Sequence, residues 1–210
     1  MAAVLLYTFA LLTTVALVSC GDVLEKATNT KFPSQSKSGL SLVGVGVRVK
    51  QIGPIAAKVY SLGIYGQKNA IASKCKAMKC KSSKELLAHK SFSDLFASGD
   101  IVLKMVRSVK VETFTEALSG AIKPRMGGKD MDAVVKFSKI FTDALPNEIT
   151  KNTEVKLTCS GGGVDVTING KNSGSVSSAI LSKAMIQTYT DKNAVSPSLR
   201  EDVSKNVINW

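Results

Sequence analysis

The chain has 210 residues, 44% of them hydrophobic, and a net charge of +12, which is ordinary material for one globular domain rather than two. Its single histidine, His89, argues against a histidine-based catalytic triad or metal site. We therefore expect no metal and no other cofactor.

Residues 1–20 contain no charged side chain and form an apolar stretch of about signal-peptide length. We interpret them as a cleaved secretory signal, which predicts a protein of the secretory pathway or a secreted one. An uncleaved membrane anchor is an alternative, because the stretch nearly reaches the length of a spanning helix. A lipoprotein signal that is lipidated at Cys20 is another. Residues 21–38 are polar and predict a flexible segment, which would also suit a two-part plastid leader.

Strands are expected at about residues 40–51, 56–65 and 101–109, followed by a hairpin of residues 154–159 and 164–168 around a glycine-rich turn. Helical periodicity marks residues 83–99, 111–122, 131–145 and 175–189. This order predicts an α+β domain at residues 39–210, with a largely antiparallel sheet covered by a layer of helices.

Six lysines lie between residues 74 and 90, where we expect a solvated basic loop. No aromatic residue interleaves with them to stack bases, so no nucleic-acid partner is expected. Apart from the leader, this loop is the expected place for any contact with an anionic membrane. Cys75 and Cys80 lie within it, close enough in sequence to form a disulfide in an oxidising compartment. Cys159 is predicted to be a lone core thiol.

In the first strand, Arg48 lies on the face opposite to the valines. A hairpin centred near Pro54 would place Arg48 across from Tyr60, and Leu62 and Ile64 across from two glycines. This pattern predicts an apolar slot with free space above the glycines, closed at one end by a guanidinium and a phenol. Such a slot suits an apolar molecule with an anionic end. The alternative is an edge arginine that faces water.

The segment GVGVRVKQIGPIAAKVYSLGIYG, residues 44–66, resembles the first hairpin of the chalcone isomerase fold. Further similar segments follow in the same order: DIVLKMVRSVKVETFTEALSGAI, AVVKFSKIF, EVKLTC with VDVTING, and SAILSKAMIQTYTDKNAVSPSLRED. The resemblance covers about residues 39–203. The family contains isomerases that close chalcones to flavanones, fatty-acid-binding members, and members of unknown activity.

This resemblance implies roles for two residues of the hairpin. Arg48 matches the arginine that, in the isomerases, stabilises the charge that develops during ring closure. Tyr60 stands where the isomerases have a threonine, and it resembles the tyrosine that the fatty-acid-binding members use beside the arginine to hold a carboxylate.

The resemblance also implies that other catalytic groups are missing. Phe114 replaces an active-site tyrosine, Ala121 an asparagine, and Met105 a nearby lysine, while Ser182 resembles the Ser/Thr at the far end of the cleft. Each lost donor typically lowers a catalytic rate by about a hundredfold, and the replacements make the cleft more apolar, as an acyl chain prefers.

We therefore expect a monomeric, non-catalytic protein that binds a fatty acid or a similar amphiphilic carboxylate. The alternative is an intramolecular lyase of the chalcone isomerase type, in which Arg48 would be catalytic. The expected ligand-binding residues are Arg48, Tyr60, Leu62, Ile64, Met105, Phe114, Ala121 and Ser182.

Overall fold

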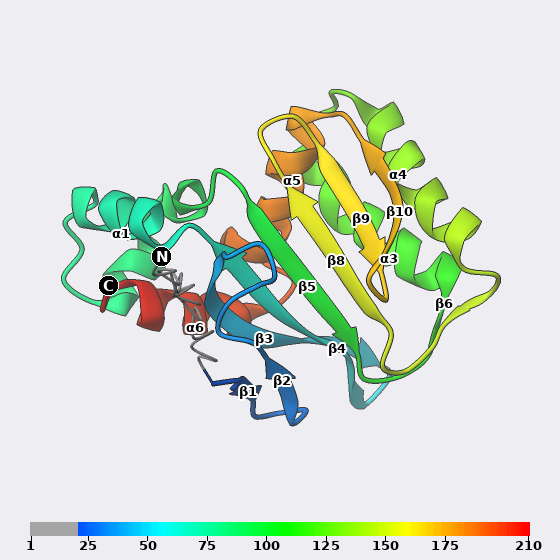
Figure 1. The fold of residues 1–210 in the computed structure, drawn as a ribbon, viewed down its shortest axis with the longest axis horizontal. Coiled ribbons are helices and arrows are strands. Elements are labelled where there is room, and N and C mark those ends of the chain that lie inside the picture. The colour runs from blue at the N-terminus through cyan, green and yellow to red at the C-terminus, as the bar shows by residue number, and fades with distance from the viewer. Residues whose placement is uncertain (1–20) are drawn as a thin grey trace, which may run out of the picture.

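A six-stranded antiparallel sheet organises the computed structural model, which describes residues 21–210 (Figure 1). The strands lie in the order β10-β9-β8-β5-β4-β3. This arrangement confirms the expected α+β class and antiparallel sheet. The strand bounds are β3 Ser41–Ile52, β4 Ile55–Gly66, β5 Gly99–Met105, β8 Glu154–Cys159, β9 Val164–Ile168 and β10 Lys171–Val176.

Helices cover one face and one end of this sheet. In Figure 1, α3, α4 and α5 lie behind β8, β9 and β10, while α6 runs beside β3 and α1 lies beyond the end of β4. Two 3-10 helices and a two-stranded pair, β6 with β7, complete the connections on this side. The bounds are α1 Lys68–Ala77, α2 Ser83–Ala88, η1 Phe92–Leu95, β6 Val109–Lys110, α3 Val111–Ile122, η2 Lys123–Arg125, α4 Met131–Ala144, β7 Glu148–Ile149, α5 Ala179–Thr190 and α6 Pro197–Val207.

The larger hydrophobic core lies between the sheet and this helical layer. Side chains from β4, β5, β8 and β9 meet the buried faces of α3, α4, α5 and α6. Helix α4 contributes apolar residues at helical spacing, such as Ala133, Phe137 and Phe141, which are all at most 3% exposed. The sequence pattern therefore predicted α3 and the β8–β9 hairpin at their observed bounds, and α4 to within one residue.

The opposite face of the sheet carries a small second core. Here the sequence prediction was wrong, because residues 21–38 include a short hairpin, β1 Val23–Glu25 and β2 Thr30–Phe32, rather than a flexible segment. Phe32 is fully buried and packs with Val45, Tyr65 and Val102. This aromatic side chain holds the segment on the sheet together with hydrogen bonds, such as those from Ser61 to Thr30 and from Lys104 to the carbonyl of Lys31.

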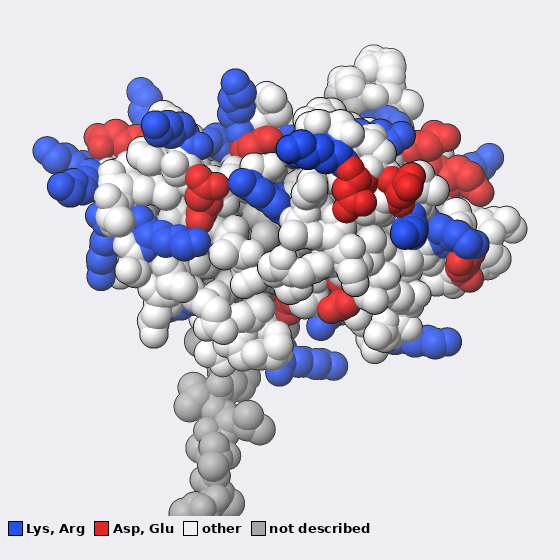
Figure 2. Space-filling view, turned by 90° about the horizontal axis from the view of Figure 1, so that it is seen from above, with Lys and Arg blue, Asp and Glu red and all other residues white. Residues whose placement is uncertain are grey.

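The lysine-rich region, residues 74–90, is also more regular than predicted. It contains the end of α1, where only a loop was expected, and all of α2, which lies within the helix expected at residues 83–99. Ser82 caps α2 by accepting a hydrogen bond from the backbone N–H of Glu85. Figure 2 shows basic side chains gathered over this end of the molecule, with few acidic ones between them.

Helix α6 closes the outer edge of the sheet. Strand β3 is an edge strand, and side chains of α6 pair with its backbone groups. Asp202 accepts a hydrogen bond from the Val45 N–H at 2.9 Å, and Ser198 accepts one from the Val47 N–H at 3.1 Å. Asn206 donates to the carbonyl of Val43 at 2.9 Å. The edge that would otherwise be open to a further strand is thereby satisfied within the chain.

Within residues 21–210, no helix is long and apolar enough to cross a bilayer. The secretory leader expected at residues 1–20 lies outside the described residues.

Candidate functional site

The β3–β4 hairpin brings Arg48 and Tyr60 together. The two residues are cross-strand partners, as the sequence predicted. Nearer the turn, however, Val49 pairs with Lys58, so Val59 is an extra residue in β4. The bulge makes the predicted pairing of Arg48 with Tyr60 possible. In an uninterrupted ladder, Arg48 would face Val59, and Tyr60 would point to the other side of the sheet.

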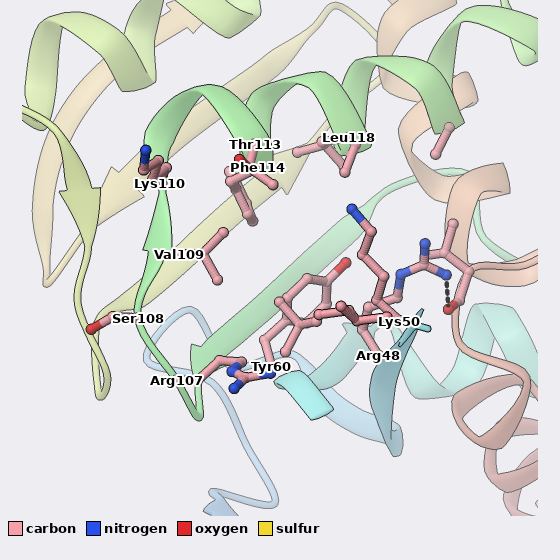
Figure 3. A pocket seen from close by; sticks show the side chains of 15 residues that line it. Arg48, Lys50, Tyr60, Arg107, Ser108, Val109, Lys110, Thr113, Phe114 and Leu118 are labelled. Atoms are coloured by element: carbon pink, nitrogen blue, oxygen red, sulfur yellow. Dashed lines mark hydrogen bonds between the residues drawn. The ribbon is translucent and has the colours of Figure 1, made fainter. Parts of the chain in front are cut away.

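A cavity of about 290 Å³ lies above this pair, between the sheet and α3. Figure 3 shows Arg48, Lys50 and Tyr60 pointing from the sheet toward the helix, with Phe114 and Leu118 on the opposite wall. Its volume is near the lower end of small-molecule sites, which span about 300–1,000 Å³. It therefore suits a small ligand or one end of a longer one. The lining residues are Arg48, Lys50, Ile52, Val59, Tyr60, Arg107, Ser108, Val109, Lys110, Thr113, Phe114, Ala117, Leu118, Ala121 and Val195.

Arg48 is held in place by only one of its N–H groups. Its Nη1 donates a hydrogen bond to the carbonyl of Val195 at 2.8 Å, drawn as the dashed line in Figure 3. The side chain is half-buried, and its other N–H groups have no hydrogen-bond partner among the described residues. Since an arginine carries five such donors in a planar fork, most of the guanidinium is available to an anion in the cavity.

An ion pair between Arg125 and Asp191 positions the loop that carries the Val195 carbonyl. Arg125 forms a two-bond pair with Asp191, with both nitrogen-to-oxygen distances at 2.7 Å. It also donates to the carbonyl of Asn193 at 2.9 Å. These contacts fix the loop between α5 and α6, so the position of Arg48 depends on a rigid support.

Tyr60 is buried, and its hydroxyl contacts the Tyr189 hydroxyl of α5 at 3.3 Å. Tyr189 is fully buried and has no other hydrogen-bond partner among the described residues. If Tyr60 donated, the Tyr189 proton would be buried without an acceptor, which is costly. The favourable arrangement therefore has Tyr189 donating to Tyr60, which leaves the Tyr60 proton free for an acceptor in the cavity.

Both phenols stay protonated at neutral pH. Burial raises the pKa of Tyr60, and the Tyr189 hydrogen bond and the Arg48 charge offset only part of that rise. Burial raises the pKa of Tyr189 well above its usual value, and the nearby Tyr60 adds to the effect. The hydroxyl of Tyr60 is therefore a neutral donor beside a permanent cation, a combination that suits a carboxylate.

The other wall of the cavity is apolar. Phe114 of α3 meets Tyr60 edge-on, with ring centroids 6.3 Å apart, and meets Phe141 of α4 in the same way at 5.3 Å. Val109 and Leu118 also line this side. The cavity thus has a polar end at Arg48 and an apolar wall that a hydrocarbon segment can contact.

The charge around the cavity has one sign. Besides Arg48, the exposed side chains of Lys50, Arg107 and Lys110 belong to its lining, which contains no aspartate or glutamate. None of these basic residues forms an ion pair with a residue in the described part of the chain. An anionic ligand is therefore favoured on approach as well as in the bound position.

The structure brings together half of the predicted ligand-binding residues. Arg48, Tyr60, Phe114 and Ala121 line the cavity. Met105, the cross-strand partner of Tyr60, does not line it and is buried in the main hydrophobic core instead.

The remaining three predicted residues lie elsewhere. Ser182 is on α5, where its hydroxyl donates to the carbonyl of Ser160 at 2.5 Å and borders a different hollow. Leu62 and Ile64 share the strand face of Tyr60, but they belong to the core beneath α6. These three side chains support the fold and do not touch the cavity.

The expected free space above the two glycines is absent. A Cβ atom on Gly44 would lie 2.8 Å from the backbone nitrogen of Val203, and one on Gly46 would lie 2.4 Å from that of Leu199. The glycines allow the backbone of α6 to approach the strand. The slot predicted from the sequence is therefore filled by a helix along most of its length and remains open only at the Arg48 end.

Sequence reasoning missed two supporting residues. Tyr189 follows Leu181 and Met185 at four-residue intervals, a spacing that marks the buried face of a helix but not the partner it reaches. Val195 acts through its backbone carbonyl, for which a sequence carries no signal.

The three cysteines of residues 21–210 lie away from this site. Cys75 is buried and Cys80 is half-buried, and both are free thiols in the structure; a disulfide between them in an exported protein stays a prediction. Cys159 is a buried core thiol, as expected, and burial raises its pKa to about 12. Within residues 21–210, no group of three or more His, Cys, Asp or Glu side chains is arranged to hold a metal ion.

Known proteins share both the sequence pattern and the fold. A solved structure, a fatty-acid-binding protein from Arabidopsis thaliana, matches with a TM-score of 0.77 and 23% identity, over 90% of this chain and 98% of that one. Among curated proteins, "Fatty-acid-binding protein 1" of Arabidopsis thaliana is 28% identical over 88% of this chain and 70% of its own length. "Chalcone--flavanone isomerase 2-A" of Glycine max is 24% identical over 85% of this chain and 88% of its own length.

The family assignment follows from a match that spans most of the chain. The sequence model described as "Chalcone isomerase-like" matches residues 25–203, a range that includes the site and nearly every described helix and strand. The chain belongs to the chalcone isomerase-like family.

Proposed function

We propose that this protein binds a fatty acid or a similar amphiphilic carboxylate in the cavity between β3, β4 and α3. The carboxylate lies at the free guanidinium edge of Arg48 and accepts a hydrogen bond from Tyr60. The hydrocarbon segment next to it contacts Phe114, Val109 and Leu118. The observation that carries the proposal is the convergence of Arg48 and Tyr60 at the polar end of an apolar cavity whose lining has no carboxylate.

One feature of the relatives and one of the cavity support this proposal over catalysis. The relative with 28% identity and the matching solved structure are both named as fatty-acid-binding proteins, whereas the relatives named as isomerases are 24% and 23% identical. In addition, Phe114 and Ala121 line the cavity without offering any side-chain hydrogen-bond donor. Ring closure needs such donors where the enone oxygen gains charge.

The decisive experiment is a fatty-acid titration of the Arg48→Ala variant. Removing the guanidinium leaves the bound carboxylate without its charged partner, so we expect a loss of about 1.5–3 kcal/mol, or roughly ten- to a hundredfold in affinity. Arg107→Ala is the matched control, because Arg107 lines the same cavity but is exposed. That variant should lose less than about fivefold.

A methyl ester of the same fatty acid separates the charge from the chain. The ester offers no anion to Arg48, so its affinity should be nearly the same for the wild-type protein and Arg48→Ala. Unchanged fatty-acid affinity in Arg48→Ala would exclude the carboxylate position proposed here.

The isomerase alternative is tested on the wild-type protein with a chalcone. Arg48 is present in the cavity, and relatives named as chalcone isomerases exist. We expect flavanone formation no faster than the uncatalysed reaction. Conversion well above that background would make the cavity an active site despite Phe114 and Ala121.

A further inference from the structure

The tip of the β3–β4 hairpin exposes an apolar pair. Ile52 and Ile55 flank the turn and are 55% and 65% exposed, and Val49 beside them is 39% exposed. The turn itself contains Gly53, whose φ of +57° lies in the left-handed region, followed by Pro54. Adjacent exposed apolar side chains with polar residues around them are typical of an interaction site.

Basic side chains surround this tip on both sides. The cavity on one side is lined by Arg48, Lys50, Arg107 and Lys110. The hollow on the other side is lined by Ile55 together with Lys58, Lys104, Arg107 and Lys151. No aspartate or glutamate belongs to either lining, although Glu154 lies 3.7 Å from Lys104.

We propose that this tip, defined by Ile52, Ile55 and the surrounding basic residues, docks on the surface of an anionic lipid bilayer. Exposed isoleucines enter the boundary between headgroups and acyl chains, while lysines and arginines beside them contact the anionic headgroups. A protein partner would have to supply both an apolar socket and a ring of carboxylates, whereas a bilayer with anionic lipids offers both layers everywhere. The charge complementarity of the two linings therefore favours the bilayer.

This docking surface differs from the lysine-rich region considered from the sequence. Residues 74–90 follow the far end of β4, whereas Ile55 begins it. A strand of twelve residues separates the two regions, about 35–40 Å at the usual rise. The basic residues of 74–90 also lack a projecting apolar pair, since their buried neighbours Ile71, Cys75 and Leu86 face the core.

The position of the tip links docking to the entry of a ligand into the cavity. Ile52 is both exposed and part of the cavity lining, so a docked tip brings the mouth of the cavity to the bilayer. An amphiphile can then enter from the membrane without crossing bulk water. This use rests on the proposed function, but docking itself requires no ligand and is measured without one.

Vesicle flotation of residues 21–210 tests the docking. This segment contains every described helix and strand and both hydrophobic cores, and it omits the apolar leader, which would itself bind lipid. We expect flotation with phosphatidylcholine vesicles that contain phosphatidylglycerol, and little with phosphatidylcholine alone. The variant Ile52→Ser with Ile55→Ser should lower the partition coefficient by about tenfold.

Two matched controls distinguish binding through the tip from nonspecific adsorption to the vesicles. Val135→Ser removes an apolar side chain that is also 65% exposed, but on α4, and should leave flotation unchanged. Replacing Lys50 and Lys110 with glutamine should weaken binding by about fivefold per charge. Replacing Lys81 and Lys84, which are equally exposed in the lysine-rich region, should have a much smaller effect.

Several results would overturn the proposal. Equal flotation of the wild-type protein and the isoleucine double variant would do so, provided that both melt at the same temperature. A larger loss from the Lys81 and Lys84 substitutions than from Lys50 and Lys110 would assign the contact to the lysine-rich region instead. If the tip variant changed only self-association, measured by sedimentation velocity, the partner would be a second copy. Loss of docking in the single variant Ile55→Ser, whose side chain does not line the cavity, with intact fatty-acid affinity would leave the proposed function standing.

Discussion

Strand β3 has a closed half and an open half on the same face. In the closed half, Gly44 and Gly46 lie directly against the backbone of α6. In the open half, Arg48 lies below α3 with a cavity of about 290 Å³ in between. Only one residue, Val47, separates Gly46 from Arg48 along the strand. Yet the first position admits no additional atom, and the next position on that face adjoins a ligand-sized space.

The difference shows how one face can serve both stability and binding. Where the side chain is a hydrogen atom, a helix backbone approaches closely and seals the sheet. At Arg48 the side chain is long and charged, and a bulge at Val59 changes the direction of the partner strand. There the helical layer lies farther from the sheet and leaves a cavity.

The largest effect is expected in the closed half. Gly46→Ala places a methyl group 2.4 Å from the nitrogen and 2.6 Å from the Cα of Leu199, atoms of a helix backbone that must shift as a unit. We expect a loss of about 3 kcal/mol in the free energy of unfolding, measured by urea denaturation. Gly120→Ala on α3 is the control, because nothing lies within 4 Å of its added carbon; it should stabilise by about 0.5–1 kcal/mol. Equal midpoints for the two variants would contradict the close approach of α6.

In the open half, a larger side chain should fill the space at little cost to folding. Ala121→Leu projects into the cavity from α3, so we expect fatty-acid affinity to fall by about tenfold. The free energy of unfolding should change by less than about 0.5 kcal/mol. Ala144→Leu, at an exposed position near the end of α4, should alter neither quantity. A large loss of stability in Ala121→Leu would mean that the cavity is closed in solution.

Alkaline pH provides a further comparison, because the buried thiol and the buried phenols must lose their protons in surroundings that exclude water. Burial raises the pKa of Cys159 to about 12 and raises those of Tyr60 and Tyr189 as well. A raised pKa in the folded state means that the folded protein holds its protons longer than the unfolded chain. Stability should therefore be unaffected by these groups below about pH 8.5 and fall from there toward pH 12.

Thermal melts of residues 21–210 over this pH range measure that decline. All three tyrosines of this segment, Tyr60, Tyr65 and Tyr189, have raised pKa values, so phenolate absorbance should appear only with unfolding. Tyr189→Phe should show a shallower decline than the wild-type protein, because one buried phenol is gone. Ionisation of the buried phenols well before unfolding would show that water reaches Tyr189 from the cavity.

The smallest effect is expected from a single hydroxyl at the border of the two halves. Tyr60→Phe keeps the ring against Phe114 and removes the donor to the ligand, so fatty-acid affinity should fall by about 1 kcal/mol, or roughly fivefold. Tyr65→Phe is the control, because Tyr65 is buried on the opposite face of the sheet with Phe32. The affinity of that variant should match the wild type. An unchanged Tyr60→Phe would leave Arg48 as the sole polar contact of the carboxylate.

The pairing of Arg48 with Tyr60 could be predicted because strand alternation and a glycine-proline turn are local signals. What packs against Gly44 and Gly46 could not be predicted, since a glycine on a strand face permits either a void or the close approach of another backbone. Leu62 and Ile64 were assigned to the ligand for the same reason. The approaching backbone belongs to α6, more than 130 residues away in the sequence.

Other parts of the site depend on contacts of this long-range kind. Tyr189 meets Tyr60 across 129 residues, and Val195 meets Arg48 across 147. Neither contact has a periodic pattern, because a single hydroxyl and a single carbonyl make them. Elements with repeated apolar positions, such as α3, α4 and the β8–β9 hairpin, were predicted better than the partners that complete the cavity, whereas α1 and the edge strand β10 were not predicted.

The closure of β3 by α6 also orders events during synthesis. The N–H groups of Val45 and Val47 find their partners only in residues 198–202, about 150 positions later in the chain. Until the ribosome has made residues 198–202, the first long hairpin presents an unpaired edge to any other strand nearby. Final folding must therefore wait for the last helix, and a chain shortened before residue 198 should expose an edge prone to aggregation, even with its cavity residues all present.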